Sequence, residues 1–198
     1  MPSSDPQNPN SSETPLTRFG DLLVHLCKNE VTYAAVGGVA VSLNGFGRFT
    51  VDVDLFLDDT PENLKRAIHA LSLFGQGYAR ELRPADLLIE SGSVRIGEYF
   101  DIDLFTRMMG LRFQDVQEDL RYTEYRGYRI PHVGPGTIIR LKTGSYREKD
   151  RLDVIAMRNI LNDERAAAGL PPPVGFWHRL LARLRALRAS RATRDKSA

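Results

Sequence analysis

The chain has 198 residues, 42% of them hydrophobic and 26% charged, which are proportions typical of a globular domain. Its single cysteine, Cys27, excludes an internal disulfide framework and a cysteine-rich zinc site. No stretch approaches the roughly 18 consecutive apolar residues of a membrane span, and the first residues lack a secretory signal pattern, so we expect a cytoplasmic protein.

The net charge of +2 is distributed unevenly along the chain. Residues 176–198 contain seven Lys and Arg and one Asp, whereas residues 1–175 contain 20 basic and 24 acidic residues. Leucines recur at helical spacing in this basic segment, with arginines between them. Such a segment suits contact with a nucleic-acid backbone or an anionic membrane surface, or packing against the body of the protein.

The first part of the chain alternates helical and extended patterns. Residues 1–15 are polar and rich in Ser, Pro and Asn, which predicts a disordered leader. The expected elements that follow are a helix at 16–28, a strand at 31–36 that ends at Gly37 and Gly38, a short helix at 39–44, a strand at 49–57, and a helix that starts at Thr60–Pro61 and closes at Gly75.

The rest of the chain predicts short strands before two final helices. The expected elements are strands at 87–89, 94–96 and 99–105, a helix at 112–120, a hairpin with strands at 122–125 and 128–133, and helices at 137–143 and 149–164. The predicted fold class is therefore α+β, a small mixed sheet flanked by helices with a C-terminal helical segment. We expect a leader at 1–15, one domain at 16–165, and a proline-rich linker and basic tail at 166–198.

Two of the expected strands carry paired aspartates. Asp52 and Asp54 are separated by one apolar residue, and Asp101 and Asp103 repeat this spacing on a later strand. Residues i and i+2 of a strand point to the same face, so each pair projects two carboxylates side by side. An acid pair alone is often only a solvated surface. Four converging carboxylates would repel one another, and a hard divalent cation is the natural counter-ion.

These motifs resemble the nucleotidyltransferase superfamily, which has the DNA polymerase β-like fold. The resemblance rests on the hydrophobic-Gly-Gly turn at 36–38 and on the Arg-Phe-Thr-Val-Asp-Val-Asp-Leu run at 48–55. A later segment, residues 138–153, is similar to a motif of the abortive-infection, toxin-type (AbiEii-like) bacterial nucleotidyltransferases. The resemblance covers about residues 20–163.

The resemblance implies a role for each matched residue. Gly37 and Gly38 would contact a nucleoside triphosphate, and Asp52 and Asp54 would hold Mg²⁺. A third acid would complete the metal site and act as general base, with Asp103 favoured and Asp101 still possible. The basic residues expected to neutralise phosphate charge are Lys142, Arg48, Arg147 and Lys149. Asp150 would be either a catalytic or a structural acid.

The implied activity is Mg²⁺-dependent transfer of a nucleoside monophosphate from an NTP to an acceptor hydroxyl. RNA, especially tRNA, and protein are the expected acceptors, with a role as a toxin-antitoxin or phage-defence toxin and a cognate antitoxin as partner. Two alternatives stay open from the sequence. One is an antibiotic-modifying nucleotidyltransferase, and the other is a non-catalytic nucleotide-binding partner protein on the same fold.

Overall fold

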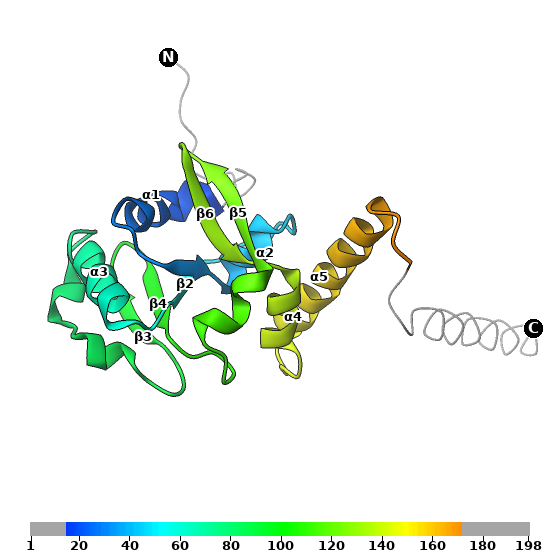
Figure 1. Ribbon diagram of the computed structural model, residues 1–198. Coiled ribbons are helices and arrows are strands. Elements are labelled where there is room, and N and C mark those ends of the chain that lie inside the picture. Colours follow the sequence, from blue (N-terminus) through cyan, green and yellow to red (C-terminus); the bar gives the residue numbers. More distant parts are fainter. Residues whose placement is uncertain (1–14, 172–198) are drawn as a thin grey trace, which may run out of the picture. The chain divides into compact units, whose positions relative to one another are not determined.

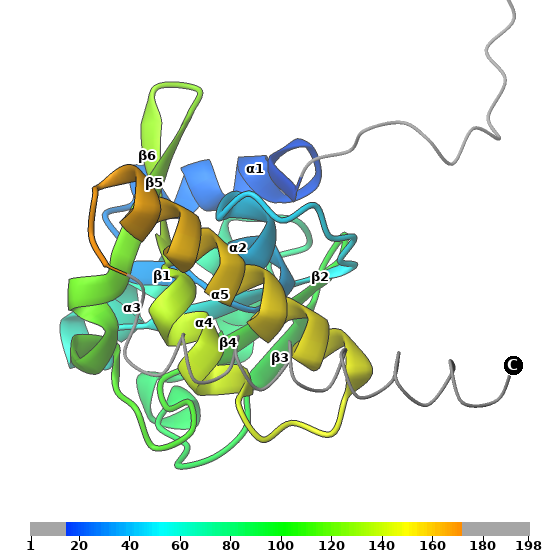
Figure 2. The same cartoon turned by 90° about the vertical axis from the view of Figure 1, so that its right-hand side faces the viewer.

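The computed structural model describes residues 15–171 (Figures 1 and 2). The expected leader before residue 15 and the basic segment after residue 171 lie outside the described residues. The chain divides into two compact units, the first ending at Arg158 and the second beginning at Asn159. The sheet and the candidate site belong to the first unit.

Helices and strands occur at nearly all the positions that the sequence predicts. The α-helices are α1 (Pro15–Lys28), α2 (Gly37–Leu43), α3 (Pro61–Ser72), α4 (Pro135–Lys142) and α5 (Glu148–Ala167). The strands are β1 (Tyr33–Ala35), β2 (Asp52–Leu57), β3 (Val94–Gly97), β4 (Asp101–Phe105), β5 (Leu120–Tyr125) and β6 (Tyr128–Val133). Three 3₁₀ helices lie between them in the described chain: η1 (Tyr78–Glu81), η2 (Pro84–Leu87) and η3 (Phe113–Asp119).

The strands of the described residues form one six-stranded mixed sheet in the order β3-β4-β2-β1-β6-β5. Strands β2 and β4 are parallel neighbours, as are β1 and β6, whereas the other adjacent pairs are antiparallel. The expected α+β class with a small mixed sheet flanked by helices is therefore confirmed. The pairing of β2 with β4 also brings the two acid-bearing strands side by side.

Alternation along β2 and β4 separates an apolar face of the sheet from a polar one. Val53 and Ile102 are fully buried and belong to the main hydrophobic core, whereas the aspartates on either side of them point to the opposite face. Helices α1 and α3 supply the other half of this core through their apolar stripes. The fully buried residues of these stripes are Phe19, Leu22, Leu23 and Leu26 from α1 and Leu64, Ala67 and Ala70 from α3.

Two expected elements differ in kind from the prediction. The expected strand at 87–89 is wrong, because Leu87 is the last residue of the 3₁₀ helix η2 and the next two residues belong to no strand. Pro84 fits the first helical position, and the Asp86 carboxylate accepts the Arg83 N–H at 2.7 Å, which closes the turn. The expected helix at 112–120 is the 3₁₀ helix η3, closed in the same way where Asp115 accepts the Arg112 N–H at 2.7 Å.

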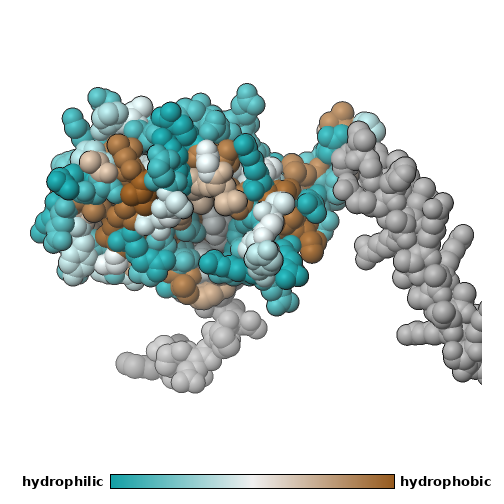
Figure 3. Space-filling model, turned by 90° about the horizontal axis from the view of Figure 1, so that it is seen from below, coloured by the Kyte–Doolittle hydropathy of each residue, from teal (hydrophilic) through white to brown (hydrophobic). Residues whose placement is uncertain are grey.

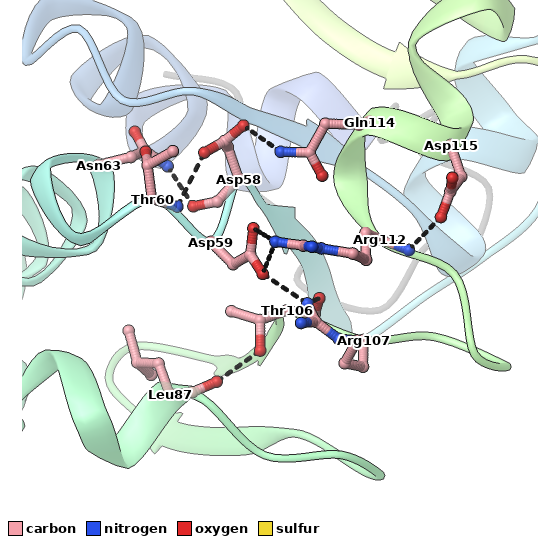
Figure 4. Close-up of polar contacts among 10 residues, drawn as sticks. All are labelled: Asp58, Asp59, Thr60, Asn63, Leu87, Thr106, Arg107, Arg112, Gln114 and Asp115. Carbon is pink, nitrogen blue, oxygen red and sulfur yellow. Dashed lines mark hydrogen bonds and ion pairs between the residues drawn. The ribbon is translucent and has the colours of Figure 1, made fainter.

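A polar cluster ties the end of β2 to the segment after β4 (Figure 4). The Asp59 carboxylate accepts hydrogen bonds from Arg107 at 2.6 Å and from Arg112 at 2.8 Å. Asp58 accepts the Thr60 N–H at 2.9 Å at the start of α3, a position where the Thr60 side chain itself makes no capping bond. Each of these acids is 9% exposed and has partners, so the cluster fixes the connections at this end of the sheet.

The surface is mostly hydrophilic, with hydrophobic patches on the face seen in Figure 3. Exposed hydrophobic side chains include Phe49 and Val51, which directly precede β2, and Tyr146, which precedes α5. No helix among the described residues is long and apolar enough to cross a lipid bilayer.

Candidate active site

The aspartates of β2 and β4 lie on one face of the sheet in direct register. Asp52 pairs with Asp101 and Asp54 pairs with Asp103 across the parallel strands. Paired residues of neighbouring strands project to the same face, so the four carboxylates form a two-by-two array. Asp103 is 4% exposed, whereas the Asp101 side chain is 49% exposed at the margin of the array.

Asp54 is a carboxyl of this array whose pKa its surroundings raise clearly. Its pKa is raised to about 6, first because burial disfavours the charged carboxylate, and then because Asp52 and Asp103 repel a further negative charge. Lys142 and Arg48 act in the opposite direction and partly offset this repulsion. The candidate site therefore combines like-charged carboxylates with two nearby cationic side chains.

The glycine pair makes room for the acid strand. A Cβ atom on Gly37 would lie 1.8 Å from Oδ2 of Asp54, and Gly37 has a left-handed φ of +58°. A Cβ atom on Gly38 would lie 2.8 Å from Oγ1 of Thr50, whose hydroxyl donates a 2.8 Å hydrogen bond to the Asp52 carboxylate. Only residues without a side chain allow this close approach. The turn at the start of α2 is thus packed directly against the carboxylate array.

The two central cations are held by buried acids on α5. Lys142 Nζ contacts Asp150 Oδ1 at 2.6 Å and Asp153 Oδ2 at 2.8 Å, and Arg48 Nη1 donates to Asp153 Oδ2 at 2.6 Å. Ser145 donates to the second oxygen of Asp150 at 2.7 Å. Asp153 therefore joins the loop before β2 to α4 and α5, and its side chain is 1% exposed. Buried charges of this kind need such paired partners.

The other two predicted phosphate-binding residues lie at the surface. Arg147 and Lys149 are exposed at the start of α5. Arg147 is close enough to Asp150 to help lower the pKa of that carboxyl, although burial of Asp150 opposes the effect and Lys142 contributes more. Arg48 and Lys142 thus lie close enough to Asp54 to act on its charge, whereas Arg147 and Lys149 are exposed at the surface.

Sequence reasoning missed Arg95, Ser93 and Asp153. Arg95 lies on β3 opposite Asp103 and forms a two-pronged contact with it, at 3.0 Å from Nε and 2.7 Å from Nη2. Ser93 donates to the same carboxylate at 2.9 Å. The available signal was Arg95 itself, a charge between the apolar residues Val94 and Ile96 of a strand adjoining an acidic strand.

The array offers carboxylate oxygens, which are the donor atoms that a hard divalent cation prefers. Asp52 and Asp54 offer adjacent carboxylate oxygens, and a cation would relieve the repulsion that, after burial, raises the pKa of Asp54. The described residues contain no group of three or more His, Cys, Asp or Glu already placed to hold a metal ion. The third acid, Asp103, has both carboxylate oxygens engaged by Arg95.

Comparison with solved structures identifies the fold. An antigenic nucleotidyltransferase-like protein from Paracoccidioides brasiliensis superposes with a TM-score of 0.50 and 19% identity, covering 76% of this chain and 78% of that one. The chain has a nucleotidyltransferase-like fold. The lincomycin-bound lincosamide antibiotic adenylyltransferase LnuA also matches, with a TM-score of 0.44 and 19% identity over 76% of this chain and 99% of that one. No protein-family model and no curated protein sequence matches the chain.

Proposed function

We propose that this protein is a metal-dependent nucleotidyltransferase that moves a nucleoside monophosphate from an NTP to an acceptor hydroxyl. The observation that carries the proposal is the carboxylate array, in which Asp52, Asp54 and Asp103 share one face of the sheet beside the turn at Gly37 and Gly38. Arg48 and Lys142 place positive charge next to this array, as a polyphosphate substrate requires.

The reaction forms a bond between the acceptor oxygen and the α-phosphorus and breaks the bond to the β-phosphate, so pyrophosphate leaves. Mg²⁺ held by Asp52 and Asp54, with Asp103 completing the site, would neutralise charge on the phosphate oxygens. Asp103 would take the proton of the acceptor hydroxyl as general base. Lys142 and Arg48 would bind the triphosphate, and the backbone at Gly37 and Gly38 would contact it. The exposed Arg147 and Lys149 would attract it from solvent.

The proposal extends to the acceptor, to the toxin-type group and to an antitoxin partner. The motif at residues 138–153 supports membership of the toxin-type group, and within it RNA, above all tRNA, or protein is the proposed acceptor. An antitoxin partner belongs to this hypothesis. The basic residues after residue 175 support an acidic acceptor such as RNA.

The test is transfer of label from each of the four α-³²P-labelled NTPs, with Mg²⁺ and total RNA, cell extract or a hydroxylated antibiotic as acceptor. We expect label in RNA or protein with the wild-type chain, and a loss of roughly a hundredfold or more in Asp52→Asn and Asp54→Asn. Asp86→Asn, on the exposed surface of η2, is the matched control and should keep full activity. Wild-type transfer rates in Asp54→Asn would refute the proposal.

A further inference from the structure

Three side chains form a row across neighbouring strands on the polar face of the sheet. Arg95 on β3 is paired with Asp103 on β4, and Asp103 is paired with Asp54 on β2. Strand β4 lies between the other two, so Asp103 has a cation on one side and a carboxylate on the other.

Arg95 binds both oxygens of the middle residue. Its Nε donates to Asp103 Oδ1 at 3.0 Å and its Nη2 donates to Oδ2 at 2.7 Å, while Nη1 reaches Asp101 Oδ2 at 3.1 Å. Ser93 adds a hydrogen bond to Oδ1 at 2.9 Å. Two parallel, charge-assisted hydrogen bonds fix both the position and the orientation of a carboxylate. Asp103 is therefore held toward β3, on the side of β4 away from β2.

This contact conflicts with the use of Asp103 as a ligand of a cation shared with Asp54. A shared cation would have to lie on the β2 side of β4 and would bind carboxylate oxygens that already accept hydrogen bonds from the positively charged Arg95. Asp54 is close enough to Asp103 for their charges to repel each other. Asp103 thus has two alternative partners, one on each neighbouring strand.

We propose that Arg95 is a positioning residue that competes with the divalent cation for Asp103. The positive guanidinium on both oxygens of Asp103 opposes the approach of a second cation to that carboxylate, so Arg95 lowers the affinity of the site for metal. This inference rests on the proposed function, because it takes the carboxylate array to be the metal site.

The test is a titration of the full-length chain with Mn²⁺. Electron paramagnetic resonance measures the concentration of free Mn²⁺ at each step, which gives the affinity. We expect Arg95→Ala to bind Mn²⁺ about tenfold more tightly than wild type, because Asp103 loses its competing partner. Arg95→Lys should lie between the two, since one ammonium group cannot hold both oxygens as the guanidinium does. Arg83→Ala, which removes an arginine from an exposed pair with Asp86, should match wild type.

A double-mutant cycle separates this role from a general effect on charge or folding. In an Asp103→Asn background, Arg95→Ala should change Mn²⁺ affinity little, because the contested ligand is gone. Arg95→Gln, which keeps part of the hydrogen bonding, replaces Arg95→Ala if circular dichroism shows that the alanine variant does not fold.

The outcomes distinguish failure of the role inferred for Arg95 from failure of the proposed metal site. Mn²⁺ binding that requires Asp54 but is unchanged or weakened in Arg95→Ala overturns the inference and leaves the metal site in place. Absence of Mn²⁺ binding at millimolar concentration in wild type and in every variant overturns both.

Discussion

Asp54 is a carboxyl whose ionisation is disfavoured by the fold. Its pKa rises from 3.8 to about 6, so the folded state holds this proton more tightly than the unfolded chain does. The stability that this proton contributes is fully present below pH 3.8 and is lost as the pH rises through about 6. At neutral pH, the charged Asp54 side chain therefore lowers the free energy of unfolding.

Asp54→Asn is expected to stabilise the protein at pH 7.5 in the presence of EDTA. The amide cannot ionise, which removes a cost of up to about 3 kcal/mol, at about 1.4 kcal/mol per pKa unit. Urea unfolding of wild type and variant at pH 4 and pH 7.5 measures the effect. The difference between the two proteins should nearly vanish at pH 4. A variant less stable than wild type at pH 7.5 would show that the carboxylate is favourably held.

Gly37 is a second residue whose identity follows from the site. Alanine there would bring Cβ within 1.8 Å of an Asp54 oxygen and would force a side chain into a left-handed conformation. We expect Gly37→Ala to lower the free energy of unfolding by about 1–3 kcal/mol and to displace Asp54. Gly47→Ala is the matched control, because nothing lies within 4 Å of its added Cβ. Equal stability of the two variants in urea would contradict the close-packing argument.

At the scale of elements, pairing of acids with arginines connects segments that are distant in sequence. Asp59, just after β2, binds Arg107 and Arg112, which flank the loop between β4 and η3 (Figure 4). The Asp59 side chain is 5% exposed, compared with 55% for Arg112. Burial opposes the ionisation of Asp59, but the two arginines outweigh it and hold its pKa below the usual value.

Asp59→Ala is expected to destabilise the protein by about 2 kcal/mol, because charge-assisted hydrogen bonds from two arginines to a buried carboxylate are lost. Asp86→Ala removes one acid from an exposed pair and should cost clearly less than Asp59→Ala. Since the folded pKa of Asp59 is depressed, its stabilisation is present above pH 3.8 and is lost as the pH falls below that value. Thermal unfolding at pH 7 and pH 3 checks both expectations, and an equal loss in the two variants would contradict them.

Most elements were predictable because their signals are local. The apolar spacing of α1 and α3 and the proline at the start of α3 mark helices, and glycines mark the ends of strands and the β5–β6 hairpin. The failure at 87–89 came from a short apolar run, which is compatible with a strand or with a buried turn. There, Pro84 and the Asp86 carboxylate decided the outcome through a contact closed within the turn itself.

At the scale of the whole molecule, the uneven distribution of charge gives a prediction for the acceptor. The seven basic residues after residue 175 lie outside the described residues, so their role stays a hypothesis from the sequence. Deletion of residues 174–198 should weaken RNA binding at about 50 mM salt and flatten its salt dependence, because fewer phosphates are neutralised.

The matched control for this deletion is a full-length chain in which those seven residues are changed to Gln. Filter binding or fluorescence anisotropy with total tRNA measures both variants, which should behave alike if charge is the cause. Unchanged affinity at low salt in the deleted chain would remove the tail from the RNA-binding hypothesis.

Residue spacing along the chain predicted most of the elements and which acids share a face, because strand alternation places Asp52 with Asp54 and Asp101 with Asp103 whatever the strands pair with. Which residues meet depends on how the strands and helices pack in three dimensions. Strand order places β4 between β2 and β3, so Asp103 lies between Asp54 and Arg95, and packing of α4 and α5 brings Lys142 and Arg48 to Asp153. Those contacts join residues many positions apart, and local spacing carries no information about such partners.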